Sequence, residues 1–200
     1  MAVYKDAKRN TWYVSFRYSD SFGNRKRKLK RGFRTKTEAN RWEMDFWTQE
    51  EYKKFIETMM DQPYYFYGFE ILYWCGLRIG ELLALTPADF DFEKKTVSIN
   101  KSYQRINKKD VITEPKTSKS IRTIIMPDFL SDEIEDFIEM HYGIQPNQRI
   151  FPLTKRHYEL QIKNGSKTAG VKTIRVHDLR HSHVSLSQGY FWDSLADCLR

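Results

Sequence analysis

Residues 64–85, YYFYGFEILYWCGLRIGELLAL, form an apolar stretch that only three charged side chains interrupt. Such a stretch predicts two buried helices, and Gly76 and Gly80 allow either a close approach of backbones or a break between the helices. Arg78 lies in the middle of this stretch. Because a buried, unpaired guanidinium costs several kcal/mol, we expect Arg78 to be buried and paired with Glu81 or with a phosphate.

Residues 176–186, VHDLRHSHVSL, contain three of the five histidines of the chain. At helical spacing His177, Arg180 and His181 fall on one side, where a histidine and an arginine one turn apart can clamp an anion, bind a metal or lie in a solvated helix. A metal site built on the two histidines needs a third ligand, and Asp178 stands where an HExxH motif has its glutamate. We therefore expect no metal.

The positive charge of the chain is concentrated at its N-terminal end. Residues 1–46 hold 13 Lys/Arg against 5 Asp/Glu, which is the whole net charge of +8, and residues 47–200 hold 21 of each. Basic charge gathered in this way suits a polyanion, of which nucleic acid is the commonest. A basic face on an ordinary structural or RNA-binding protein remains the alternative.

The N-terminal quarter predicts strands followed by a helix. Residues 11–18 (TWYVSFRY) alternate as a strand does, 19–24 are rich in turn formers, and 35–38 (TKTE) form a capping box that opens a helix. Residues 25–33 (RKRKLKRGF) return as a basic strand, expected to form a cationic sheet face. Its predicted DNA contacts are Arg25, Lys26, Arg27, Lys28, Lys30 and Arg31.

The rest of the chain predicts a second, larger unit. A capping box at 48–51 opens a helix, residues 95–106 and 120–127 predict strands joined by a polar segment, and 130–141 predict an amphipathic helix. The expected class is α+β, with a small three-stranded sheet-plus-helix N-terminal domain followed by a mostly helical domain that carries a short antiparallel sheet.

Compartment signals point to a reducing cytoplasm. No run of about 18 apolar residues predicts a membrane span, and the N-terminus lacks the apolar region of a signal peptide. The two cysteines, Cys75 and Cys198, form no disulfide framework.

The motifs GLRIGELLAL, PKTSKSIRTIIMP and HDLRHSHVSL, in this order, resemble the catalytic domain of the tyrosine recombinases, the phage-integrase family. Residues 1–46 resemble the arm-type DNA-binding domain of phage and conjugative-transposon integrases, and residues 48–200 resemble a C-terminally truncated catalytic domain. The resemblance implies a site-specific recombinase of a mobile element. It would act on double-stranded DNA at the nucleoid, with several copies assembling there, and would use neither a cofactor nor a small-molecule substrate.

In that family two arginines, a lysine and a histidine surround the scissile phosphate. Matched motif by motif, the resemblance implies that Glu81 and His181 are supporting residues and that Lys119 is a second choice for the lysine. The implied catalytic set is Arg78, Lys116, His177 and Arg180. These residue types suit the chemistry because preorganised cations stabilise the charge that develops on a phosphate, and a lysine can protonate the leaving oxygen.

Two expected features of the family are not found. No motif of the nucleophilic tyrosine follows Arg180, Tyr190 is only ten residues beyond it, and the nucleophile is unknown. In the family a helical core-binding domain usually separates the two units, but here the units 1–46 and 48–200 follow each other directly, so no residues are left for that domain. We therefore expect an incomplete, cleavage-deficient form that binds DNA, with a non-catalytic DNA-binding remnant as the alternative.

Overall fold

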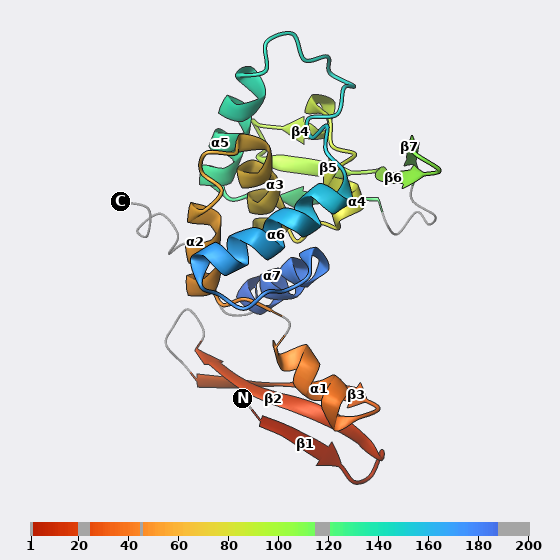
Figure 1. Ribbon diagram of the computed structural model, residues 1–200, viewed down its shortest axis with the longest axis vertical. Helices are drawn as coiled ribbons and strands as arrows, with labels where there is room; N and C mark the ends of the chain where they lie inside the picture. Colours follow the sequence, from red (N-terminus) through yellow and green to blue (C-terminus); the bar gives the residue numbers. More distant parts are fainter. Residues whose placement is uncertain (1, 20–24, 45, 115–120, 188–200) are drawn as a thin grey trace.

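The computed structural model describes residues 2–19, 25–44, 46–114 and 121–187, and gives the backbone alone for residues 2, 16–19, 25–28, 41–44 and 184–187. A small sheet-and-helix unit and a larger mixed body make up the molecule, and helix α7 (Leu179–Ser187) lies on the side of the body nearest the small unit (Figure 1). This architecture confirms the predicted α+β class.

The small unit is a three-stranded antiparallel sheet with a helix on one face. Helix α1 begins beside the predicted capping box, in which the Glu38 amide donates to Thr35 Oγ1 at 3.0 Å. Val14, Phe33 and Ala39 are buried between the sheet and the helix. The strand order is β1-β2-β3, and the elements are β1 (Ala2–Asp6), β2 (Thr11–Ser19), β3 (Arg25–Phe33) and α1 (Lys36–Met44).

The body packs helices around a short antiparallel sheet of order β4-β5-β8 and carries a separate hairpin, β6-β7. Its helices are α2 (Gln49–Glu57), α3 (Pro63–Trp74), α4 (Ile79–Leu82), α5 (Asp128–Glu139), α6 (Lys155–Ala169) and α7. Its strands are β4 (Phe90–Asp91), β5 (Thr96–Ile99), β6 (Ser102–Ile106), β7 (Lys109–Thr113) and β8 (Arg122–Ile125). Over the residues that the structure describes, every helix is too short or too polar to cross a bilayer.

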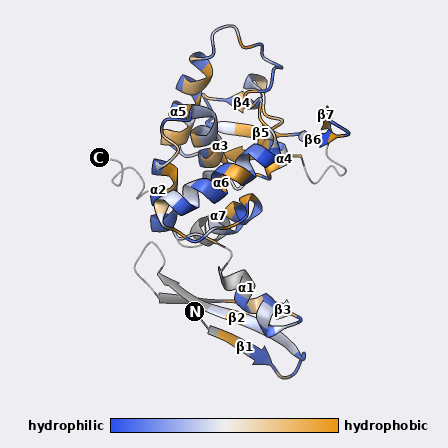
Figure 2. Cartoon of the chain, in the orientation of Figure 1, coloured by the Kyte–Doolittle hydropathy of each residue, from blue (hydrophilic) through white to orange (hydrophobic). Residues whose placement is uncertain are grey.

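The apolar stretch 64–85 forms the centre of the core, as predicted. It divides into α3 and α4, and the break falls at Gly76, whose φ of +62° is a left-handed conformation that favours glycine. Around α3 the core is aromatic: the rings of Tyr52 and Tyr73 stack with their centroids 3.5 Å apart. Figure 2 shows the hydrophobic segments gathered in the body around α3, α5 and β5.

Several elements differ from the prediction, which assigned no residues to β1, β4 or β7. Residues 95–106 do not form one strand: β5 pairs with β8, whereas β6 leaves the sheet to pair with β7. The β6-β7 turn holds Asn107 and Lys108 at φ +50° and +65°, the backbone that a two-residue hairpin loop requires. Helix α6 was not predicted, because its buried apolar side chains, Tyr158 and Ile162, are too few to show a clear helical period.

Close packing between α3 and α6 makes Gly68 sensitive to substitution. A Cβ atom added at Gly68 would overlap the Tyr158 hydroxyl oxygen and lie 2.8 Å from two ring carbons of Tyr158, a ring that is fully buried. We expect Gly68→Ala to lower the free energy of unfolding by about 2 kcal/mol, measured by denaturant titration. The exposed α6 residue Asn164 is the control, and an equally small effect of Gly68→Ala and Asn164→Ala would contradict this packing.

Candidate active site

Gly76 joins two segments that lie about a hundred residues apart in the sequence. Its carbonyl oxygen accepts a hydrogen bond of 2.6 Å from Nη1 of Arg180, on α7. A Cβ atom at Gly76 would lie 2.5 Å from Cδ2 of His183, also on α7, so glycine is needed for this close approach as well as for the turn. The loop that leads to Arg78 is thereby fixed against the helix that carries Arg180.

Arg78 stands at the N-terminal end of α4 and is held there by Glu81. Its backbone amide donates to Glu81 Oε2 at 2.9 Å, and its Nη1 donates to Glu81 Oε1 at 2.8 Å. The expected pairing with Glu81 is therefore present, but the expected burial of Arg78 is wrong, because 55% of its side chain is exposed. The reason is the break at Gly76: the chain leaves the core there, so that Arg78 points outward while Leu77 and Leu82 remain buried.

A third arginine, which the sequence analysis did not single out, shares the same carboxylate. Arg122 on β8 donates from Nη1 to Glu81 Oε1 at 3.0 Å and from Nη2 to Glu81 Oε2 at 2.7 Å. A two-pronged contact of this kind is the strong form of the arginine–carboxylate pair. An arginine inside the apolar strand sequence IRTII was the available signal for Arg122.

The arginines shift the ionisation of Glu81. Burial alone would raise the pKa of Glu81, but the hydrogen bonds from Arg122 and Arg78 outweigh burial and bring the pKa to about 2. Glu81 is therefore a carboxylate at neutral pH, with only 8% of its side chain exposed.

Arg180 lies in the field of the other two arginines. Its pKa is lowered first by burial and then by the positive charges of Arg78 and Arg122, and Glu81 opposes this shift. Arg78 and Arg122 both contact the Glu81 carboxylate, and the charges of both act on Arg180. Such a cluster has an excess of positive charge and is suited to bind an anion.

His177 and His181 lie next to this cluster. His177 belongs to the short turn Val176–Asp178 that precedes α7 and is exposed, and its ring centroid is 5.6 Å from that of His181. Burial is the main cause of the lowered pKa of His181, and the positive charge of Lys30 is a smaller cause. The carboxylate of Asp178 is occupied by Arg175, whose Nε and Nη2 donate to it at 2.8 and 2.9 Å.

A metal ion requires a cluster of ligand side chains. In the described part of the chain, no group of three or more His, Cys, Asp or Glu side chains is arranged to hold one. The predicted lysine, Lys116, and its alternative, Lys119, lie outside the described residues.

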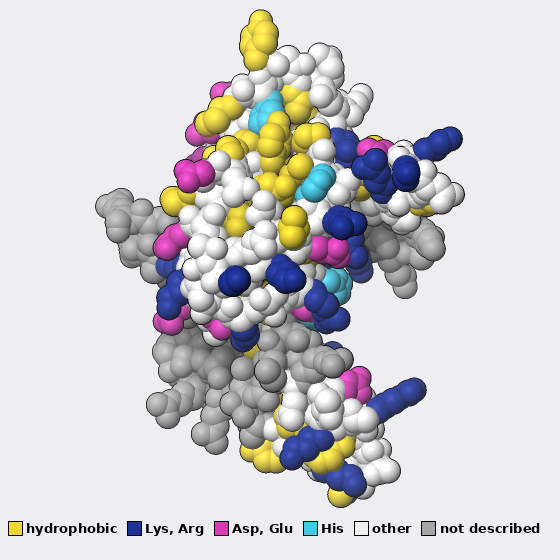
Figure 3. Space-filling model, viewed as in Figure 1, with side chains coloured by type: hydrophobic (Ala, Val, Ile, Leu, Met, Phe, Trp, Pro, Cys, Tyr) yellow, Lys and Arg dark blue, Asp and Glu magenta, His cyan; other side chains and the backbone are white. Residues whose placement is uncertain are grey.

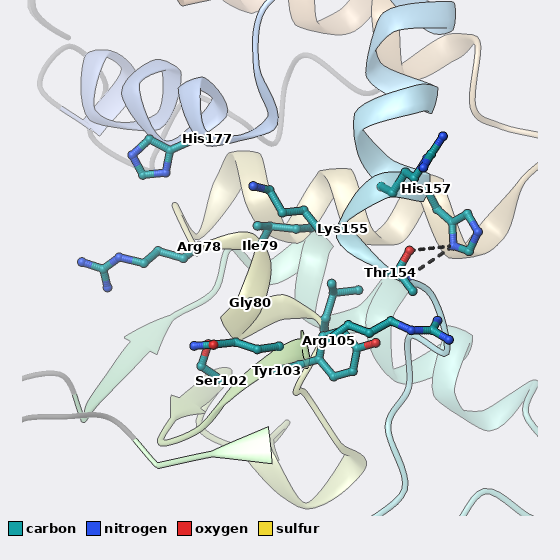
Figure 4. Close-up of a pocket in the computed structure, with 13 residues that line it drawn as sticks. Arg78, Ile79, Gly80, Ser102, Tyr103, Arg105, Thr154, Lys155, His157 and His177 are labelled. Carbon is teal, nitrogen blue, oxygen red and sulfur yellow. Dashed lines mark hydrogen bonds between the residues drawn. The ribbon is translucent and has the colours of Figure 1, made fainter. Parts of the chain in front are cut away.

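A groove of about 760 Å³ begins at Arg78 and is bounded by the β6-β7 hairpin and by the start of α6 (Figure 4). Its described lining contains no Asp or Glu and includes, besides Arg78 and His177, four side chains that the sequence analysis missed: Arg105, Lys155, Arg156 and His157. Figure 3 shows Lys and Arg side chains gathered along the edge of the body that carries the hairpin. The lining is therefore basic, although two of its cations are paired with acids outside it: Arg105 Nε lies 3.7 Å from Asp110 Oδ1, and Lys155 Nζ lies 3.3 Å from Glu159 Oε1.

Arg149 fixes the hairpin that forms one wall of this groove. Its guanidinium lies 4.1 Å from the centroid of the Tyr103 ring, and its Nη2 is 3.5 Å from Oδ2 of Asp110. The Tyr103 hydroxyl donates to Asp110 Oδ1 at 2.8 Å. Tyr103, the tyrosine among the described lining residues, is thus engaged in holding β6 to β7.

On the small unit the two predicted cations with described side chains lie on opposite faces of the sheet. Lys30 is paired in register with Val14, on the face covered by α1, and Arg31 is paired with Tyr13, on the open face. The expectation of one cationic face is therefore wrong for this pair, because neighbouring strand residues point in opposite directions. Arg31 lies 5.7 Å from the Tyr13 ring, which stacks on Tyr4. The side chains of Arg25, Lys26, Arg27 and Lys28 lie outside the described part.

The ionisation of Glu81 gives a prediction about stability and pH. The pKa of Glu81 is lower in the folded chain than its ordinary value of 4.5, so its contribution is complete above 4.5 and is lost as the pH falls toward about 2. We expect Glu81→Gln to lower the free energy of unfolding by about 3 kcal/mol at neutral pH, and the difference from the wild type to shrink over that acidic range. Denaturant titrations at several pH values measure it. The exposed Glu139→Gln is the control, and a difference independent of pH would contradict the ion-pair geometry.

Comparison with family models covers nearly the whole described chain. Residues 2–49 match the model described as an arm DNA-binding domain, and residues 45–186 match the model described as the phage integrase family.

Curated relatives and solved structures agree with these matches. The ICEBs1 integrase of Bacillus subtilis (strain 168) is 32% identical over 160 residues, which cover 73% of this chain and 44% of the relative. The putative prophage phiRv2 integrase of Mycobacterium tuberculosis is 31% identical over 57% of this chain and 32% of the relative. The chain thus spans less than half the length of both relatives.

Among solved structures, the Tn1549 transposon integrase (aa 82–397) in complex with circular intermediate DNA superposes with a TM-score of 0.59 at 25% identity, over 68% of this chain and 52% of that chain. XerA recombinase superposes with a TM-score of 0.55 at 20% identity, over 70% and 47%, and shows a shared fold.

Proposed function

The chain belongs to the phage integrase family of tyrosine recombinases. From this premise we propose that it takes part in site-specific recombination of a mobile element and that it binds a DNA phosphodiester. The observation that carries the proposal is that Arg78 and Arg122 share the Glu81 carboxylate while Arg180 is held at the Gly76 carbonyl, two residues before Arg78. This cluster lies at the end of a groove whose described lining has cations and no acid. The DNA complex of the Tn1549 integrase supports duplex DNA as the ligand.

The proposed chemistry follows from the charge that a phosphodiester develops when it is attacked. In the reaction proposed for the family, a tyrosine hydroxyl loses its proton to a general base as its oxygen bonds to phosphorus. The 3′-phosphotyrosyl link replaces the bond to the 5′-oxygen, and that oxygen leaves with a proton from a general acid; no tyrosine of this chain is assigned the role of nucleophile. Negative charge grows on the non-bridging oxygens, and the forks of Arg78 and Arg180 are suited to stabilise it because each is planar and permanently charged. His177 is proposed to donate to the same phosphate, and Lys116 to protonate the leaving oxygen.

The two parts of the chain are proposed to have different tasks. Residues 1–46 form an arm-type DNA-binding domain, and residues 48–200 form the catalytic domain. Glu81 and His181 support the catalytic group through the contacts described above. The proposed place of work is bacterial DNA at the nucleoid.

The arginine cluster is tested on the full 200-residue chain with a suicide duplex built from the ends of the element that encodes it. We expect Arg78→Gln/Arg180→Gln to weaken binding in native gels at least tenfold, because two charge-assisted contacts to one phosphate are lost. The control is Lys94→Gln, which removes one charge from an exposed Lys–Asp pair. Equal affinities of the double variant and the wild type would overturn the proposed role of the cluster.

The same duplex reports on strand cleavage when it is run under denaturing conditions. We propose in addition that the chain is cleavage-deficient, on the ground that the tyrosine in the described lining of the groove, Tyr103, is hydrogen-bonded to Asp110. We therefore expect the wild-type chain to bind this duplex without a covalent protein–DNA band. A covalent band would show that the chain cleaves DNA and would remove the cleavage-deficient part of the proposal.

The open face of the small sheet is proposed to carry the arm contact. Because each phosphate contact contributes about 0.9 to the slope of log affinity against log salt, Arg31→Gln is expected to reduce that slope by about one. Lys30→Gln, one residue away on the opposite face, is the matched control and should change it less. A slope unchanged by Arg31→Gln would contradict the assignment of this face.

A further inference from the structure

Arg122 reaches Glu81 from β8, whereas Arg78 reaches it from the start of α4. Both oxygens of Glu81 are shared: Oε1 accepts from Nη1 of Arg78 and Nη1 of Arg122, and Oε2 accepts from the Arg78 amide and Nη2 of Arg122. Arg122 is the more enclosed of the two arginines, with 26% of its side chain exposed against 55% for Arg78. Arg122 is therefore the inner partner of the carboxylate, behind it as seen from solvent, and Arg78 is the outer, more exposed partner.

The net charge of Arg78, Glu81 and Arg122 determines how strongly this part of the site attracts a phosphate. Arg78 and Glu81 alone would form a neutral pair, which would attract a phosphate weakly and would compete with it for the same guanidinium. With Arg122 bound to the rear of Glu81, the trio carries one net positive charge, and the exposed member of the trio is Arg78. Arg180, held at the Gly76 carbonyl oxygen, adds a further positive charge close to Arg78.

We propose that Arg122 is a positioning residue: it neutralises Glu81 from behind, so that the charge and the exposed edge of Arg78 remain available to the phosphate. This inference rests on the proposed function. It assigns Arg122 no contact with DNA, and it gives Glu81 a purely orienting role, fixing the Arg78 backbone and side chain together.

A double-mutant cycle on the full chain separates this role from a structural one. The affinity for one DNA duplex is measured for Arg122→Gln, Glu81→Gln and the double variant. Arg78→Gln is the reference and Lys94→Gln is the control. Thermal unfolding is recorded for every variant. We expect Arg122→Gln to weaken binding about tenfold, because Glu81 then neutralises Arg78. In the Glu81→Gln background, the same Arg122→Gln change should alter binding less than about twofold.

The outcomes are distinct. Binding by the double variant within about twofold of Glu81→Gln supports the inference, since a loss of packing at Arg122 would weaken binding in that background too. An equal loss from Arg122→Gln in both backgrounds would overturn it, because Arg122 would then act on DNA directly. If Arg122→Gln unfolds the chain, the double variant is compared with Glu81→Gln instead. Neither of these two variants has a carboxylate at position 81 that lacks its arginine, so this comparison decides the question. If Arg78→Gln itself leaves binding unchanged, the proposed function fails, whatever Arg122 does.

Discussion

The carboxylate of Glu81 accepts four hydrogen bonds from two arginines, and the arrangement of the site depends on this contact. It connects the start of α4 to strand β8, two segments that the chain separates by about forty residues. Buried ion pairs of this kind contribute little net stability, because desolvation offsets much of the attraction. Their value is geometric: the four bonds hold Glu81 in one orientation, and with it the backbone and side chain of Arg78.

The backbone conformation of Gly76 is the second constraint that positions the arginines. Gly76 ends α3 in a left-handed conformation, brings the chain out of the core, and leaves room for His183 of α7. Its carbonyl oxygen then receives Arg180. The two arginines of the family motifs are thus brought to one place by the absence of a side chain at a third position.

Charge is distributed differently in space from its distribution in the sequence. Residues 47–200 are neutral in sum, yet the described lining of the groove beside Arg78 has cations and no acid. The acids of this part gather elsewhere, for example on α5, where Asp132, Glu135 and Glu139 are exposed. A count of charges along the chain identified the basic small unit and could not identify the basic groove, because Arg105, Lys155 and Arg156 come from segments that only the folded chain brings together.

The sequence by itself determined the α+β class, the sheet-and-helix unit at the front, the core around residues 64–85 and the family, because hydrophobic period, capping boxes and ordered motifs are local signals. Only the tertiary structure decided that Arg78 is exposed, that Arg122 shares Glu81, that Lys30 and Arg31 lie on opposite faces, and that α6 and the β6-β7 hairpin bound a groove. The physical reason is that a hydrogen bond to a carboxylate and the exposure of a guanidinium depend on which distant segments meet. No pattern within a few residues encodes that meeting.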